Sequence, residues 1–298
     1  MTAPAIIAVD IDGTLLSSAG DVLPGTRAEF ARAQAAGATI VLASGRPIAG
    51  LRMLIRRLKL DSRGYVLTGV NGAVSADADS GQILARHPME FDLVRDIVTL
   101  AKEEGVIAML CDGDDLVVDA EHPQVDIEAG GNALTLRRVP DLCALTSDDT
   151  TVDKVLTYAE PATLQRFAAA FAPRFDEVTE HSFSAPFYFE ATARGVDKGA
   201  ALTDIAQARG LSPQDSVAFG DNGNDLPMLR VAGIGVAMGN AIPAVLDAAD
   251  RVTASHDEEG IAVVLAELFG DGKPADALEN PEGIEALYAL DLTPPETP

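Results

Sequence analysis

The sequence contains no tryptophan and few other aromatic residues, so its hydrophobic cores must be built mainly from aliphatic side chains. Aromatic residues make up 5% of the 298 residues, whereas 47% are hydrophobic, which is enough for packed cores and argues against general disorder. Cysteine is also scarce. Cys111 and Cys143 cannot form a disulfide framework and lack metal-ligand spacing, so we interpret both as ordinary core thiols.

Long apolar segments are missing as well. No hydrophobic run reaches the length of a membrane span, and the N-terminus has no basic segment followed by a long apolar stretch. These absences predict a cytoplasmic chain without a membrane partner.

Basic residues are outnumbered by acidic ones. The chain has 22 Lys and Arg against 46 Asp and Glu, giving a formal net charge of -24 and a pI near 4.3. Such a chain repels nucleic-acid backbones and anionic lipid surfaces, so neither is an expected partner. For most of these carboxylates we favour a role in solubility or in adaptation to high salt. A site for a phosphate ester would need local positive charge of its own.

Short apolar runs alternate with helical patterns in the first and last parts of the chain. This order predicts a Rossmann-like parallel sheet covered by helices on both faces. The expected strands are residues 5–9, 39–43, 65–67, 216–219 and 234–236, and the expected helices are 26–36, 48–60, 199–209, 225–231, 241–248 and 258–268.

The middle of the chain has a different pattern. Asn71-Gly72 is a strong hairpin-turn signal, and paired strands with intervening helices follow from about residue 83. The expected elements are strands at 107–111, 116–118, 154–159, 175–179 and 187–190, with helices at 91–104 and 161–172. We therefore predict an α/β core domain formed by residues 1–83 and 191–270, an inserted α+β cap domain at 84–190, and an acidic, Pro-rich tail at 271–298.

Three of the expected core strands end in polar residues. The first runs into Asp10 and Asp12, the second into Ser44, and a later one into Asp221 and Asp225. In open α/β sheets, ligands bind at the carboxyl ends of the strands, so these side chains are expected to meet at one crevice.

Four carboxylates in one crevice require a cation. Oxygen-only ligands from Asp10, Asp12, Asp221 and Asp225, completed by a substrate phosphate, suit Mg²⁺. Lys198, at the start of an expected helix, would add a fixed positive charge. Together the ion and the lysine would supply the local positive potential that the acidic chain lacks.

Asp10 and Asp12 are two positions apart, so side chains leaving an extended segment there point the same way. One carboxylate can attack phosphorus while the other protonates the leaving oxygen, the two roles that hydrolysis through an aspartyl-phosphate requires. Gly13 allows the sharp backbone turn that follows, where nearby amides can bind phosphate oxygens.

These motifs resemble, in order, the four motifs of the haloacid dehalogenase (HAD) superfamily. Asn71-Gly72-Ala73, the long insert and the segment 195–199 further resemble its Cof-type (IIB) branch of sugar-phosphate and cofactor-phosphate phosphatases. The resemblance covers about residues 5–268 and rests on Asp10-Ile11-Asp12-Gly13-Thr14, Ser44, Lys198 and Gly220-Asp221-Asn222-Gly223-Asn224-Asp225.

The resemblance implies a Mg²⁺-dependent hydrolase of small phosphorylated metabolites. The sequence leaves open whether the chain is a monomer or a homodimer. Asp10 would be the nucleophile and a metal ligand, and Asp12 the acid/base, with its backbone carbonyl on the metal. Asp221 would bind Mg²⁺, and Asp225 would bind it directly or orient its waters. The phosphate would be held by Ser44, the Gly45 amide, Lys198 and Asn224.

Two other functions fit parts of this pattern. A phosphomutase would form the same aspartyl-phosphate but return the phosphoryl group to sugar. A non-enzymatic phospho-accepting domain would also place carboxylates, a hydroxyl and a lysine at strand ends, but its phosphoryl-aspartate would be short-lived beside an acid/base at Asp12. Arg46 could form an ion pair in the crevice or face solvent.

Several other polar and aromatic groups receive structural interpretations. The acidic segment at residues 112–115 lacks the remaining ligands of a calcium loop and is better explained as a hairpin turn. The aromatic residues Phe183, Phe187, Tyr188 and Phe189 are interpreted as packing residues, of which one or two could face the crevice.

Overall fold

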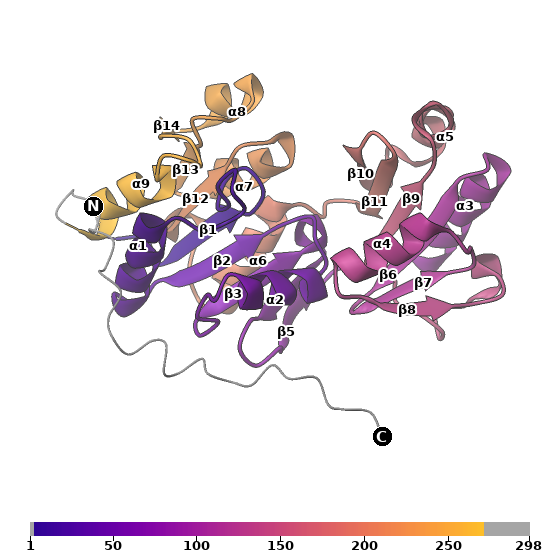
Figure 1. Cartoon of the computed structure of the whole chain (residues 1–298), viewed down its shortest axis with the longest axis horizontal. Coiled ribbons are helices and arrows are strands. Elements are labelled where there is room, and N and C mark those ends of the chain that lie inside the picture. Colours follow the sequence, from indigo (N-terminus) through magenta and orange to yellow (C-terminus); the bar gives the residue numbers. More distant parts are fainter. Residues whose placement is uncertain (1–2, 271–298) are drawn as a thin grey trace.

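The computed structural model describes residues 3–270, which form two bodies side by side, each built on its own sheet (Figure 1). The larger sheet has the strand order β14-β13-β12-β1-β2-β3-β4-β5, and the smaller has the order β10-β11-β9-β6-β7-β8. The larger sheet is assembled from both ends of the described chain, with the smaller body inserted between them. The predicted α/β fold with a Rossmann-like core and an inserted cap is thus confirmed.

The larger sheet is mainly parallel. Its parallel strands are β1 (Ile6–Asp10), β2 (Thr39–Ala43), β3 (Tyr65–Gly69), β12 (Ser216–Gly220), β13 (Ile234–Ala237) and β14 (Arg251–Val252). The antiparallel strands β4 (Val74–Asp77) and β5 (Ile83–Arg86) extend one edge. The central strands are buried on both faces, which explains their continuous apolar runs.

Helices cover both faces of this sheet. Because successive side chains alternate between faces, Ile7 and Val9 belong to one apolar cluster and Ile6 and Ala8 to another. The first cluster packs against α1 (Pro24–Ala35), α2 (Ile48–Arg57) and α9 (Gly260–Phe269), and the second against α6 (Lys198–Ala208), α7 (Leu226–Val231) and α8 (Pro243–Ala248).

The smaller body has a mostly antiparallel sheet with helices on both faces. Its strands are β6 (Ile107–Asp112), β7 (Asp115–Val118), β8 (Thr135–Arg138), β9 (Lys154–Tyr158), β10 (Thr179–Ala185) and β11 (Tyr188–Ala193). Helices α3 (Phe91–Glu103) and α5 (Pro161–Phe175) pack on one face, and α4 (Pro123–Gly131) packs on the other. The acidic segment forms the predicted hairpin turn, because Asp112 pairs with Asp115 between β6 and β7.

Two strands cross the positions predicted as domain boundaries. β5 continues to Arg86 and pairs with β4, so the larger sheet extends past residue 83. β11 continues to Ala193 in the smaller sheet, beyond residue 190. The strand expected at 175–179 is wrong, since Phe175 ends α5 and β10 begins at Thr179. The aromatic side chain of Phe175 instead completes the apolar face of that helix.

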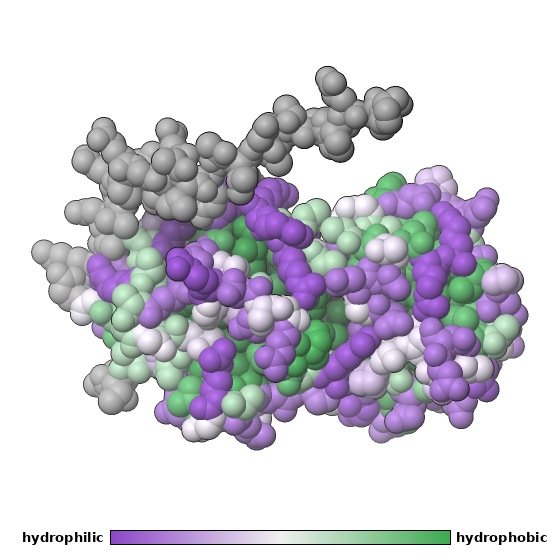
Figure 2. Space-filling view, turned by 90° about the horizontal axis from the view of Figure 1, so that it is seen from below, coloured by the Kyte–Doolittle hydropathy of each residue, from purple (hydrophilic) through white to green (hydrophobic). Residues whose placement is uncertain are grey.

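The predicted tail at 271–298 lies outside the described residues. Among residues 3–270, no helix has the length and apolar character needed to cross a membrane. On the face drawn in Figure 2, hydrophilic residues are interspersed with small apolar areas over both bodies, as expected for a chain with 23% charged residues.

Candidate active site

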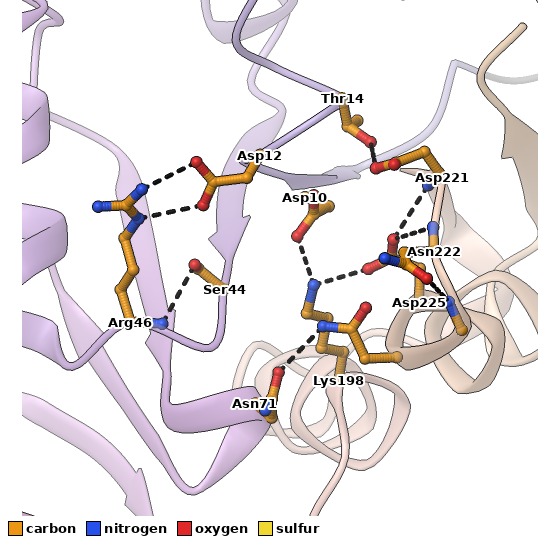
Figure 3. A network of polar contacts seen from close by, with 12 residues as sticks. Asp10, Asp12, Thr14, Ser44, Arg46, Asn71, Lys198, Asp221, Asn222 and Asp225 are labelled. Atoms are coloured by element: carbon orange, nitrogen blue, oxygen red, sulfur yellow. Dashed lines mark hydrogen bonds and ion pairs between the residues drawn. The ribbon is translucent and has the colours of Figure 1, made fainter. Parts of the chain in front are cut away.

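The three polar strand ends lie next to one another, as the sequence predicts. β1 is flanked by β12 on one side and β2 on the other, and all three run parallel. Their carboxyl ends therefore open at the same edge of the sheet, where the site residues gather (Figure 3).

Three buried or half-buried carboxylates converge at this edge. Asp10, Asp221 and Asp225 each offer an oxygen, and these oxygens lie within 4.8 Å of one another. The Lys198 ammonium group donates hydrogen bonds to Asp10 and, at 2.6 Å, to Asp225 (Figure 3). The Lys198 side chain is fully buried, so this charge is held inside the crevice.

Two glycines make room for the carboxylates. A Cβ on Gly13 would lie 2.6 Å from Asp221 Oδ2, and Gly13 has a φ of +88°, which other residues rarely adopt. A Cβ on Gly220 would lie 2.4 Å from the Asp225 Cβ. A side chain at either position would push a carboxylate out of the cluster.

Local hydrogen bonds fix the two later carboxylates. The Asp225 Oδ2 atom accepts from the backbone amides of Asp221 and Asn222, both at 3.0 Å. The Thr14 hydroxyl donates to Asp221 Oδ1 at 2.8 Å. The Gly-Asp-Asn-Gly-Asn-Asp segment thus turns back on itself so that the carboxylates of Asp221 and Asp225 both reach the cluster.

Asp12 points away from the cluster. Its carboxylate makes a two-pronged ion pair with Arg46, with N–O distances of 2.8 and 3.1 Å (Figure 3). The Asp12 side chain is 58% exposed. Of the two possibilities for Arg46, the structure thus shows the ion pair.

The residues predicted to hold phosphate lie around the same opening. Ser44 is buried, and its Oγ accepts from the Arg46 amide at 3.2 Å. The Asn224 side-chain amide donates to Asn71 Oδ1 at 3.1 Å, and a Cβ on Gly45 would lie 3.3 Å from the same Asn71 oxygen.

Asn71 is a site residue that the sequence marked only as a turn. It lies in a 3-10 turn, η1 (Val70–Gly72), where Val70 and Asn71 both have a positive φ. This conformation is unusual for the β-branched Val70. It is held by hydrogen bonds from the amides of Val70 and Asn71 to the carbonyls of Arg46 and Ser44, each 2.9 Å. The Asn-Gly signal therefore also positions the loop that follows β2.

A buried ion pair in the cap also reaches this loop, and no local sequence pattern marked it. Lys154 on β9 pairs with Glu190 on β11 at 2.7 Å, and both side chains are nearly inaccessible. The Lys154 ammonium group also donates to the Gly45 carbonyl at 3.3 Å. Only the pairing of β9 with β11 brings the two residues together.

Burial and mutual repulsion change the proton affinity of the cluster. Burial, assisted by the charge of Asp225 and opposed by Lys198, raises the pKa of Asp10 to about 7. Burial also raises the pKa of Asp221. Burial lowers the pKa of Lys198, but Asp10 and Asp225 outweigh it and raise that pKa above its usual value.

The donor set fits a divalent cation. Three carboxylates face one ammonium group, so the cluster has an excess of negative charge in a largely buried place. The absence of a Cβ at Gly13 leaves space directly beside Asp221 Oδ2. Carboxylate oxygens are the ligands that Mg²⁺ prefers in proteins.

A parallel α/β sheet that gathers carboxylates, a lysine and a hydroxyl at its strand ends, beneath an inserted cap, is the architecture of a phosphoryl-transferring hydrolase. The model of the haloacid dehalogenase-like hydrolase family matches residues 7–265. The chain belongs to this family, and the predicted HAD assignment, with its Cof-type branch, is confirmed.

Several named relatives of the chain are phosphatases. It is 31% identical to the 5-amino-6-(5-phospho-D-ribitylamino)uracil phosphatase YitU of Bacillus subtilis, covering 90% of this chain and 98% of YitU. It is 30% identical to the pyridoxal phosphate phosphatase YbhA of Escherichia coli, covering 86% and 96%. A haloacid dehalogenase-like hydrolase from Bacteroides thetaiotaomicron has a solved structure with a TM-score of 0.78 and 29% identity, covering 89% of this chain and all of that one. The prediction of a phosphatase is confirmed at the level of the family.

Proposed function

We propose that the chain is a Mg²⁺-dependent phosphatase that releases phosphate from a small phosphorylated metabolite through an aspartyl-phosphate at Asp10. The observation that carries this proposal is the buried convergence of Asp10, Asp221 and Asp225 around Lys198. Such a cluster is costly to fold unless it serves a cation and an anionic substrate.

Asp10 and Asp12 divide the chemistry. An Asp10 oxygen attacks phosphorus, and the bond from phosphorus to the leaving oxygen breaks. Asp12 gives that oxygen a proton and then takes one from the water that attacks the aspartyl-phosphate, which breaks the bond between phosphorus and the Asp10 oxygen and releases phosphate. The Asp12 carboxylate is free to reach the leaving group only when it exchanges its exposed contact with Arg46 for the substrate.

Four groups would hold the transferred phosphate: the Ser44 hydroxyl, the Gly45 amide, the Lys198 ammonium group and the Asn224 side chain. Lys198 already carries its charge between Asp10 and Asp225. A fixed charge of this kind stabilises the extra negative charge of the transition state without reorganising.

Mg²⁺ would be held by Asp10, the Asp12 carbonyl, Asp221 and Asp225, the last directly or through waters. When bound, the ion would neutralise the carboxylates and polarise the phosphate. The names of YitU and YbhA support a small phosphorylated substrate, a ribityl compound or a cofactor for those two proteins. We expect a cytoplasmic monomer or homodimer.

A charge-neutral substitution of Asp10 tests the proposal. Asp10→Asn should lose release of phosphate from p-nitrophenyl phosphate in the presence of Mg²⁺, because an amide cannot form the covalent intermediate. Asp21→Asn, an exposed aspartate in the loop that follows the catalytic segment, is the matched control and should keep its activity. Chelation by EDTA should abolish activity in wild type, and added Mg²⁺ should restore it. Activity of Asp10→Asn within tenfold of wild type would contradict the covalent mechanism.

A further inference from the structure

A cavity of about 610 Å³ lies between the two bodies and opens on the candidate phosphate site. Its wall on the larger body includes Gly45 and Asn224, two groups predicted to hold phosphate. The opposite wall is formed by the cap strands β10 and β11. The alcohol part of a phosphate ester bound at Asp10 would therefore extend into this cavity. The side chains of the wall then indicate which alcohol parts can bind.

The cap side of the cavity presents hydrogen-bond acceptors and hydroxyl groups. Glu180 and Glu190 contribute carboxylates, and Ser182, Ser184 and Thr192 contribute hydroxyls. Asp197, at the start of α6 on the larger body, adds a third carboxylate to the lining. Among the described residues that line the cavity, none is Lys or Arg. His181 also lines it, with its Nε2 3.3 Å from an Asp176 carboxylate oxygen.

The cations that balance these carboxylates do not line the cavity. Lys154, behind Glu190, is almost fully buried. Arg194, paired with Glu180 at 3.2 Å, has a side chain that is 58% exposed. Asp197 is balanced by the backbone amides of Gly199 and Ala200 at the start of α6. A ligand would thus meet carboxylate oxygens rather than their partners.

This arrangement discriminates between substrates by the charge of their alcohol part. A hydroxyl or ammonium group on the alcohol part finds acceptors on the wall. A second anionic group would lose water without gaining a cationic donor, and it would be repelled by the nearby carboxylates. Phe183, 40% exposed, also lines the cavity, and its ring packs edge-to-face against Phe189 of the cap core.

We propose that the preferred substrate is a phosphomonoester whose alcohol part is neutral or cationic and rich in hydroxyl groups, and that the cavity discriminates against a second anionic group. Glu180 is a specificity-determining residue in this scheme. The inference rests on the phosphatase function proposed above and adds the charge class of the substrate.

Two matched pairs of substrates isolate the charge. Sorbitol 6-phosphate and 6-phosphogluconate share an open six-carbon chain and differ by a terminal hydroxymethyl or carboxylate group. Glucose 6-phosphate and glucosamine 6-phosphate differ by a hydroxyl or ammonium group. At pH 8, where histidine is ordinarily neutral, kcat/KM should be about tenfold or more higher for sorbitol 6-phosphate than for 6-phosphogluconate. It should be at least as high for glucosamine 6-phosphate as for glucose 6-phosphate.

Removing the Glu180 charge should weaken this discrimination. Glu180→Gln keeps an acceptor for the Gly195 amide, which donates to Glu180 at 3.1 Å. The ratio of kcat/KM between the open-chain pair should fall by roughly threefold or more. Glu177→Gln, a control that removes the same charge from an exposed residue just before β10, should leave the ratio unchanged.

The outcomes separate the two proposals. An open-chain ratio near or below one in wild type, or the same ratio in wild type and Glu180→Gln, overturns the charge inference while phosphatase activity stands. Absence of phosphate release from all four sugar esters and from p-nitrophenyl phosphate overturns the proposed function, and the inference with it.

Discussion

Among the residues that the structure describes, Lys198 is the one buried cation of the catalytic cluster, and Lys198→Met removes it. The ammonium group is fully buried and pairs with Asp10 and with Asp225, the latter at 2.6 Å. Removing one partner from a buried ion pair costs about 3–5 kcal/mol, because the other charge is left without compensation. We expect a loss of this size in the free energy of unfolding at pH 8 without Mg²⁺.

The loss should depend on pH, and its direction follows from Asp10. The pKa of this carboxyl is raised to about 7, so Asp10 is protonated at pH 5.5 and ionised at pH 8. The missing ammonium therefore matters more at pH 8, and the loss should shrink at pH 5.5. Added Mg²⁺ should recover part of the stability at pH 8, about 1.4 kcal/mol when the ion is at ten times its dissociation constant.

Urea unfolding at both pH values measures these losses of stability. The proteins compared are wild type, Lys198→Met and Lys59→Met, an exposed control. Lys59→Met should match wild type. A loss below about 1 kcal/mol for Lys198→Met at pH 8, or the same loss at both pH values, would refute the electrostatic description of the cluster.

Three further outcomes are expected. Asp12→Asn should bind phosphate but turn over a poor-leaving-group ester at least about two orders of magnitude more slowly, whereas normal hydrolysis would remove Asp12 as the acid/base. Calorimetry should show Mg²⁺ binding about tenfold or more weaker at pH 5.5 than at pH 8, because a proton on Asp10 competes with the ion. Equal affinities at the two pH values would contradict this competition. Lys154→Met should lower the free energy of unfolding by about 3–5 kcal/mol, because it leaves the buried Glu190 carboxylate without its partner. The double variant Lys154→Met/Glu190→Leu should lose much less, and equal losses in the two variants would contradict the buried-pair account.

The sequence predicts the catalytic edge well because each part of it is locally encoded. Apolar strands end in the motif residues, and the parallel order of β12, β1 and β2 brings these ends together. Gly13 and Gly220 stand where a Cβ would collide with a carboxylate of the cluster. For Asp10, Asp221 and Asp225, the convergence predicted from the sequence pattern therefore agrees with their positions in the structure.

The cap contribution could not be read in the same way. Lys154 and Glu190 are 36 residues apart and meet only because β9 and β11 pair in one register. Strand membership at the predicted boundaries has a related cause, because hydrogen bonding to β4 and β9, rather than composition, decides which sheet β5 and β11 join. The orientation of the Asp12 side chain depends on its ion pair with Arg46. The sequence did not decide whether Arg46 forms an ion pair or faces solvent.

The covalent intermediate offers the most direct test of the central claim. Asp12→Asn would be mixed with a good-leaving-group phosphate ester and Mg²⁺, quenched with borohydride and analysed by peptide mass spectrometry. Borohydride reduces an aspartyl-phosphate to homoserine, so the account predicts homoserine at position 10 and none in an Asp10→Asn control. Homoserine at another position, or release of phosphate with no homoserine at position 10, would contradict it.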